Sequence, residues 1–182
     1  MTAKDFKEQY QDAEEKLPTH IPKPRGKAVR ITAFFDASHA ENTVTRRSHT
    51  GFVIFVNRAP IIWYSKCQNT VKASTFLSEF IALKVCMEYI VALRYKLRMF
   101  GVEIDGSANV LGDNLSVVKN SSKIESSLDK KHNALAYHAC RWAVAAEIMR
   151  VRWIDTNYNI ADALTKRLTV AKRNQLFGDW TY

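Results

Sequence analysis

The sequence predicts an α/β domain in which a mixed sheet is flanked by helices. Three segments with alternating polarity, at 29–36, 50–57 and 60–66, follow one another closely, as the strands of a meander do. A long segment with helical periodicity comes next, at 74–100. Extended and helical segments then alternate to residue 166, which is the pattern of an α/β layer architecture. With 182 residues and 47% hydrophobic side chains, the chain has the size and composition of one globular domain with a short extension.

Each element has its own local signal. The segment VRITAFFD (29–36) alternates and ends in an acid, while TGFVIFVN (50–57) and PIIWYSK (60–66) are joined so tightly that they form a hairpin. In residues 74–100 apolar side chains cover most of the helix circumference, so this helix is expected to be largely buried. We then expect a strand at 108–113, a short helix after Asn114, a helix from about 129 to 147, a strand at 148–155 and a last helix at 159–166. The result is a mixed sheet of five strands.

The domain boundaries follow from the residues that break the chain. Pro18, Pro22, Pro24 and Gly26 interrupt a polar, helix-tolerant beginning. We therefore expect an N-terminal helix or linker arm at 1–28, the domain at 29–168 and a C-terminal tail at 169–182.

The charge of the chain indicates a polyanionic partner. The formal net charge is +9, and residues 45–100 hold nine basic side chains but only two acidic ones, Glu79 and Glu88. A basic concentration of this kind is typical of nucleic-acid-binding proteins. Three cysteines without zinc spacing predict a reduced, intracellular location, and the lack of a long apolar run predicts no membrane partner.

Four carboxylates lie where a packed fold normally has apolar groups. Asp36 and Asp113 each follow an apolar strand, Glu79 lies within the buried helix, and Asp162 lies in the first turn of the last helix. An unpaired buried carboxylate destabilises a protein by several kcal/mol, so such a group needs a cation. Because neither His nor Cys accompanies these acids, the expected cation is Mg²⁺ or Mn²⁺.

The same residues resemble a known family. The order of acids is similar to that of ribonuclease H, and the local words resemble the ribonuclease H domain of copia-type LTR retrotransposon polyproteins. FFDASHAENTVTRRSHTGFVIF resembles the family opening F-x-D-A-D…T-R-R-S-x-x-G, and IIWYSKCQNTVKASTFLSEFIAL resembles the block I-x-W-x-S-K-x-Q…S-S-T-E-A-E-Y-x-A-L. LGDNLSVVKN, KKHNALAYHACR and NIADALTKRL match the later signatures D-N, K-H…Y-H-x-x-R and A-D-x-x-T-K-x-L. The resemblance implies a ribonuclease H-like fold and an endonuclease that hydrolyses the RNA strand of RNA–DNA hybrids during reverse transcription.

The resemblance also implies the catalytic residues and the cofactor. Asp36, Glu79, Asp113 and Asp162 would bind two Mg²⁺ ions, with Mn²⁺ able to substitute, and the products would carry 5′-phosphate and 3′-hydroxyl ends. Asp36 would bridge the two ions. Asp162 would complete the site of the ion that activates water. Glu79 and Asp113 would complete the site of the ion that stabilises the 3′-oxygen. The chain departs from the family pattern at Phe76 and Ser38, which replace two acids. The stretch DTNYNIAD before the last acid has no His, so no proton shuttle is assigned.

Polar residues near these acids are candidates for contacts with the nucleic acid. Small polar groups could reach sugars, and basic or amide groups could position the phosphate backbone. The candidates are Arg46, Arg47, Lys66, Gln68, Ser74, Thr75, Asn114, Lys131 and His132. The expected partners are an RNA–DNA hybrid and a reverse transcriptase domain of the same polyprotein, in the cytoplasm (in a virus-like particle) or the nucleus.

Two other functions remain open at this point. One is a non-catalytic nucleic-acid-binding module on the same fold, although a polyanion site gains nothing from four carboxylates. The other is a DNA strand-transferase that uses Asp36, Asp113 and Glu147, which would leave Glu79 and Asp162 unexplained. Trp63, Trp142 and Trp153 are expected in the core rather than as platforms for stacking bases.

Overall fold

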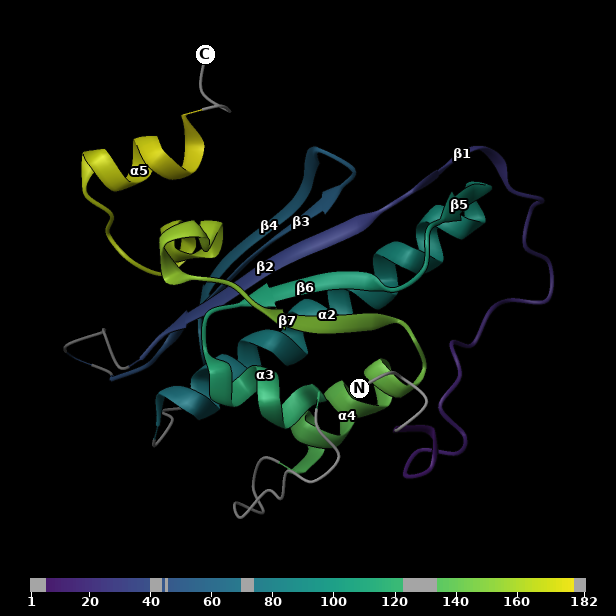
Figure 1. Ribbon diagram of the computed structural model, residues 1–182, viewed down its shortest axis with the longest axis horizontal. Helices are drawn as coiled ribbons and strands as arrows, with labels where there is room; N and C mark the ends of the chain where they lie inside the picture. The colour runs from purple at the N-terminus through teal and green to yellow at the C-terminus, as the bar shows by residue number, and fades with distance from the viewer. Residues whose placement is uncertain (1–5, 40–43, 45, 70–73, 123–133, 179–182) are drawn as a thin grey trace.

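A five-stranded mixed sheet forms the centre of the molecule (Figure 1). The computed structural model describes residues 6–39, 44, 46–69, 74–122 and 134–178. The strand order is β4 (Ala59–Cys67), β3 (His49–Val56), β2 (Ile31–Ser38), β6 (Ala108–Gly112) and β7 (Met149–Trp153). The first three strands are antiparallel, and β6 and β7 continue the sheet in parallel. The predicted sheet is therefore confirmed in strand number and direction.

The two faces of the sheet differ because side chains alternate along each strand. In β2, Ala33, Phe35 and Ala37 are buried on one face, where they join the main core with residues of helix α2 (Thr75–Met99). Asp36 belongs to the opposite face and lies within β2, not at its end as the sequence suggested. The helix packs closely on β2, as its apolar circumference predicted.

The remaining helices divide between the two faces. Helices α3 (Leu115–Ser122) and α4 (Ala134–Ala145) accompany α2 on the core side (Figure 1). The expected start of α4 near residue 129 falls outside the described residues. On the other side lie η2 (Thr156–Tyr158), η3 (Ile160–Leu164) and α5 (Val170–Phe177). The expected helix at 159–166 is thus a short 3₁₀ helix, and α5 occupies residues for which only a tail was expected.

The N-terminal segment packs onto the domain. Phe6 and Ala13 are buried in the main core, and Glu15 forms ion pairs of 2.8 Å with Arg94 and 2.5 Å with Arg98 of α2. The pKa of Glu15 would be raised by burial, but the two guanidinium groups outweigh this effect and lower it to about 2. A second sheet that the sequence did not reveal joins β1 (Arg25–Val29) to β5 (Val102–Ile104) in parallel. The domain boundary expected at residue 29 stays a prediction.

No described helix is both long enough and apolar enough to cross a membrane.

Candidate metal centre

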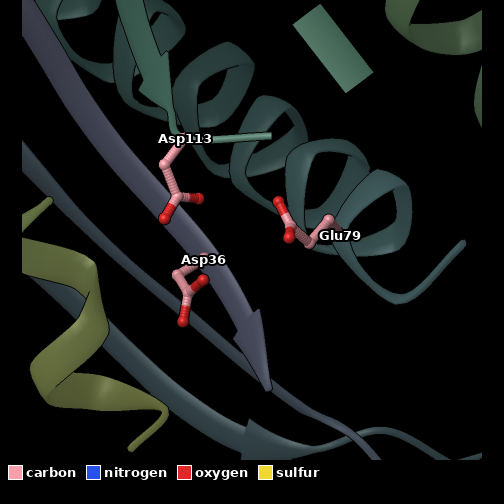
Figure 2. Close-up of side chains that lie close together, drawn as sticks. All are labelled: Asp36, Glu79 and Asp113. Carbon is pink, nitrogen blue, oxygen red and sulfur yellow. The ribbon is translucent and has the colours of Figure 1, made fainter. Parts of the chain in front are cut away.

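Three carboxylates from distant parts of the chain meet beside the middle of the sheet. Asp36 comes from β2, Glu79 from α2 and Asp113 from the residue directly after β6, and their side chains turn toward one space (Figure 2). One oxygen from each carboxylate lies within 4.8 Å of the others. Asp36 and Glu79 are buried and Asp113 is half-buried.

The local structure explains how these three acids meet. β2 and β6 are parallel neighbours, so the residue that follows β6 lies beside the later part of β2. Glu79 stands one turn into α2, whose first residues pass over the same end of the sheet. Each acid therefore lies in an element that is fixed by its apolar neighbours, which makes the arrangement rigid.

The fourth acid, Asp162, lies on η3, which packs on β2 and β3, and it shares the Lys166 ammonium with Asp36. Asn159 anchors this 3₁₀ helix, because its buried side chain donates to the Phe35 carbonyl oxygen (3.1 Å) and accepts from the Ala161 amide (3.2 Å). Gly51 pairs with Asp36 across the β2–β3 ladder and allows η3 to lie close to the strand. A Cβ at Gly51 would lie 2.6 Å from Thr165 Cγ2 and 2.9 Å from Leu164 Cβ.

Two residues just after η3 contact the acids directly. The Thr165 hydroxyl donates a short hydrogen bond to Asp36 Oδ2. The Lys166 ammonium lies 3.1 Å from Asp162 Oδ1 and 3.3 Å from both oxygens of Asp36. Burial disfavours the charged lysine, but Asp36 and Asp162 outweigh it and raise its pKa.

The electrostatics of the site favour an additional cation. Burial, followed by the charges of Asp36 and Asp113, raises the pKa of Glu79 to about 8. Burial and the charge of Asp36 also raise the pKa of Asp162. One ammonium among four carboxylates leaves an excess of negative charge, which a divalent ion would neutralise.

A free carboxylate oxygen gives a second indication of metal binding. Glu79 Oε1 accepts a hydrogen bond from Asn114 Nδ2 (3.3 Å), while Oε2 is buried and has no hydrogen-bond partner among the described residues. Such an orphaned oxygen is destabilising unless a cation or a donor meets it. An all-oxygen donor set at this spacing fits Mg²⁺ or Mn²⁺.

The candidate nucleic-acid contacts have different surroundings. Arg46, Arg47, Lys66 and Thr75 are exposed, and Ser74 is half-buried at the N-terminus of α2. Lys131 and His132 lie outside the described residues. The contact of each of these residues with nucleic acid stays a prediction.

Gln68 and Asn114 have partners within the protein. The buried amide of Gln68 donates to Thr50 Oγ1 (3.0 Å) and to the Ser78 carbonyl oxygen (2.9 Å), which fixes the residue before Glu79. The Asn114 side chain contacts Glu79 and also accepts from the amides of Ser116 (3.0 Å) and Val117 (3.3 Å) at the start of α3. Both residues therefore hold the acidic site together.

The expectation for the tryptophans is wrong for two of the three, and the strand-transferase alternative does not fit the fold. Trp63 and Trp153 are 69% and 48% exposed rather than buried in the core, whereas Trp142 does pack against it. Glu147 precedes β7 and Asp113 follows β6, which is parallel to β7. The two acids thus lie at opposite ends of five-residue strands, about 16 Å apart, and do not form a triad with Asp36.

The site contains three residues for which the sequence alone predicted no role: Gly51, Thr165 and Lys166. For Lys166 a signal was present, because a lysine four residues after an acid on a helical segment forms an ion pair with it. Gly51 and Thr165 stand in the matched words T-R-R-S-x-x-G and A-D-x-x-T-K-x-L, but their roles depend on how η3 docks on β3.

Comparisons with known proteins identify relatives by sequence and similar folds by structure. No family model matches the chain. Over 145 residues, 80% of the chain, it is 31% identical to the retrovirus-related Pol polyprotein from transposon TNT 1-94 of Nicotiana tabacum. It is 26% identical, over the same share, to that from transposon RE2 of Arabidopsis thaliana. The chain spans only 11% and 10% of these two polyproteins.

Solved structures decide the fold. The N-terminal RNase H domain of a Mycobacterium tuberculosis protein superposes with a TM-score of 0.58 at 17% identity, over 76% of this chain and 91% of that one. The chain has a ribonuclease H-like fold. RNase H1 from Halobacterium salinarum gives a TM-score of 0.57 at 17% identity, over 82% and 98% of the two chains. LC11-RNase H1, solved in complex with an RNA/DNA hybrid, gives 0.58 at 16% identity, over 75% and 94%. The resemblance seen in the sequence is confirmed.

Proposed function

We propose that the protein is an endonuclease that hydrolyses the RNA strand of RNA–DNA hybrids with two divalent metal ions. The observation that carries this proposal is the meeting of Asp36, Glu79 and Asp113 within 4.8 Å, with Asp162 near enough to feel the charge of Asp36. A ribonuclease H-like fold with this acidic site supports a nuclease more strongly than a binding module, because carboxylates repel phosphate.

The central position of Asp36 supports its role as the shared ligand. Asp113 follows β6 beside Asp36, Glu79 comes from α2 and Asp162 from η3, so Asp36 has carboxylate neighbours from three elements and could be a ligand of both ions. When bound, the two ions would activate the attacking water and stabilise the leaving 3′-oxygen. Asn114 orients Glu79, and Asn159 holds the segment that bears Asp162.

The charge of the protein supports a nucleic-acid substrate. Arg46, Arg47 and Lys66 are exposed and would contact phosphates. Ser74 and Thr75 lie one turn before Glu79 and would contact sugars. A ribonuclease H distinguishes an RNA strand by its 2′-hydroxyl groups, and these small polar side chains suit that contact. The product would carry 5′-phosphate and 3′-hydroxyl ends.

The relatives support a setting in reverse transcription. The matched proteins are Pol polyproteins, and the chain corresponds to about a tenth of each. We place the domain next to a reverse transcriptase domain, whose hybrid product it would cut.

Cleavage of a labelled RNA–DNA hybrid tests the proposal. We expect the wild-type protein to cut the RNA strand in Mg²⁺ or Mn²⁺ and to spare double-stranded RNA and DNA. Asp113→Asn should abolish cutting, because it removes one ligand charge with little change in shape. The matched control is Asp155→Asn, which changes an exposed aspartate after β7.

Salt-sensitive binding without cutting would contradict the proposal. If wild-type protein with bound Mn²⁺ holds the hybrid but leaves it intact, alone and joined to its polymerase neighbour, the chain is a nucleic-acid-binding module. Cutting by the Asp113→Asn protein would exclude the acidic site as the catalytic centre.

A further inference from the structure

Lys166 contacts Asp36 and Asp162, two of the carboxylates that the proposed function assigns to metal binding. Its ammonium lies 3.1 Å from Asp162 and 3.3 Å from Asp36, two carboxylates that are almost fully buried. The backbone amide of Lys166 donates to the Asp162 carbonyl oxygen (2.9 Å), so one helical turn holds the lysine over that acid. The position of the amine is therefore built into the fold.

The lysine side chain also has a route out of the site. It is 35% exposed, whereas Asp36 and Asp162 are 1% and 6% exposed. A lysine has a long, flexible stem that can move its charge to solvent while the stem stays in place. The amine can thus leave the acids without any change in η3.

A divalent ion and this ammonium cannot share the same oxygens. Mg²⁺ binds carboxylate oxygens at about 2.0–2.1 Å, and an ammonium beside those oxygens would lie close to the ion and repel it. The Thr165 hydroxyl donates to Asp36 Oδ2 as well, so both oxygens of Asp36 accept hydrogen bonds from the segment that follows η3.

We propose that Lys166 is the resident cation of the metal-free site and must leave Asp36 and Asp162 when a divalent ion binds. Lys166 then sets the metal concentration at which the site fills, because the ion competes with a charge that belongs to the protein. The inference rests on the metal site of the proposed function but not on the hydrolytic activity.

Metal affinity in the absence of nucleic acid is the test. We would measure Mn²⁺ binding by calorimetry for wild type, Lys166→Gln and Lys166→Arg. Lys166→Gln should bind Mn²⁺ about tenfold more tightly, since the competing charge is gone. Lys166→Arg, which keeps the charge, should show no such gain. The control is Lys172→Gln, which removes an equal charge where the amine donates to two oxygens of Asn157.

Thermal melting is a second readout that allows for poor folding. Without metal, Lys166→Gln and Lys166→Met should melt below wild type, because their acids have lost a counter-ion. Saturating Mn²⁺ should raise their melting temperatures by more than it raises that of wild type.

Equal or weaker Mn²⁺ affinity in both Lys166→Gln and Lys166→Met would overturn the inference. If these two variants still cut hybrids, the inference fails while the proposed function stands. If wild type does not cut but Lys166→Gln binds Mn²⁺ more tightly, the inference stands and the proposed function fails.

Discussion

Glu79 is held where its negative charge is disfavoured. Burial and the neighbouring Asp36 and Asp113 raise its pKa from an ordinary 4.5 to about 8. The folded, metal-free protein therefore keeps a proton on Glu79 at neutral pH, whereas the unfolded chain has released it. A metal ion would displace that proton, so ion binding and proton release are coupled at this site.

The stability of the metal-free protein should fall as the pH rises from about 4.5 to about 8. Within that window the folded state binds more protons than the unfolded state, and the free energy of unfolding decreases by at most about 1.4 kcal/mol per pH unit. Above pH 8 the contribution of Glu79 to the free energy of unfolding no longer changes with pH. Denaturant melts in a chelator should show the slope in wild type and a reduced slope in Glu79→Gln, with a remainder from Asp162.

Glu103→Gln is the matched control for this pH dependence, because Glu103 is exposed on β5. Its slope should equal that of wild type. A slope in Glu79→Gln as steep as in wild type would show that Glu79 titrates at an ordinary pH.

Each of the four acids could be predicted from its own neighbours in the sequence. Each stands in an apolar run, where a carboxylate is conspicuous, and the family resemblance gives their order. Asp36 nevertheless lies within β2 rather than at its end, because the antiparallel pairing with β3 continues to Ser38. Lys166 was not foreseen, since its importance depends on Asp36, which the fold brings to it from the other end of the chain.

At the scale of elements, the docking of η3 on β3 completes the acidic site. Gly51 allows this contact, because its missing side chain leaves room for Leu164 and Thr165. The order and type of the main strands and of α2 were predictable from alternation and helical periodicity. The β1–β5 pair and the packing of residues 6–15 were not, because each depends on a distant partner: β5 for β1, and Arg94 and Arg98 for Glu15.

Gly51→Ala should separate η3 from the strand that bears Asp36. The added methyl group would overlap Thr165 Cγ2, so the segment with Asp162 must shift. We expect a loss of about 1–3 kcal/mol in the free energy of unfolding and a loss of hybrid cleavage of about tenfold or more. Steady-state cleavage rates and denaturant melts check both values.

Thr165→Ser provides the matched background for this test. It keeps the hydroxyl that donates to Asp36 but removes the methyl group nearest to residue 51. Gly51→Ala combined with Thr165→Ser should regain part of the lost cleavage. Wild-type cleavage in the single Gly51→Ala variant would contradict the role of this close contact.

At the scale of the whole molecule, a chain with a net charge of +9 contains a cluster of carboxylates. The basic side chains would attract a nucleic acid. The acidic site would bind metal ions, which would offset the repulsion between its carboxylates and a phosphate group. The affinity for a hybrid should consequently fall steeply as the salt concentration rises.

Arg47→Gln should reduce that salt dependence. If Arg47 contacts one phosphate, the slope of log K against log [salt] should decrease by about one. Arg30→Gln is the control, because exposed Arg30 already pairs with Asp105 at 2.8 Å. Fluorescence anisotropy at several salt concentrations measures both slopes, and equal slopes in the two variants would exclude Arg47 as a phosphate contact.

A crystal structure of the protein with Mn²⁺, read from anomalous diffraction, tests the central claim most directly. The account predicts Mn²⁺ in contact with Asp36, Glu79 and Asp113, and Lys166 turned away from Asp36. A fully loaded crystal in which Mn²⁺ lies elsewhere, while these carboxylates keep their metal-free contacts, would contradict it.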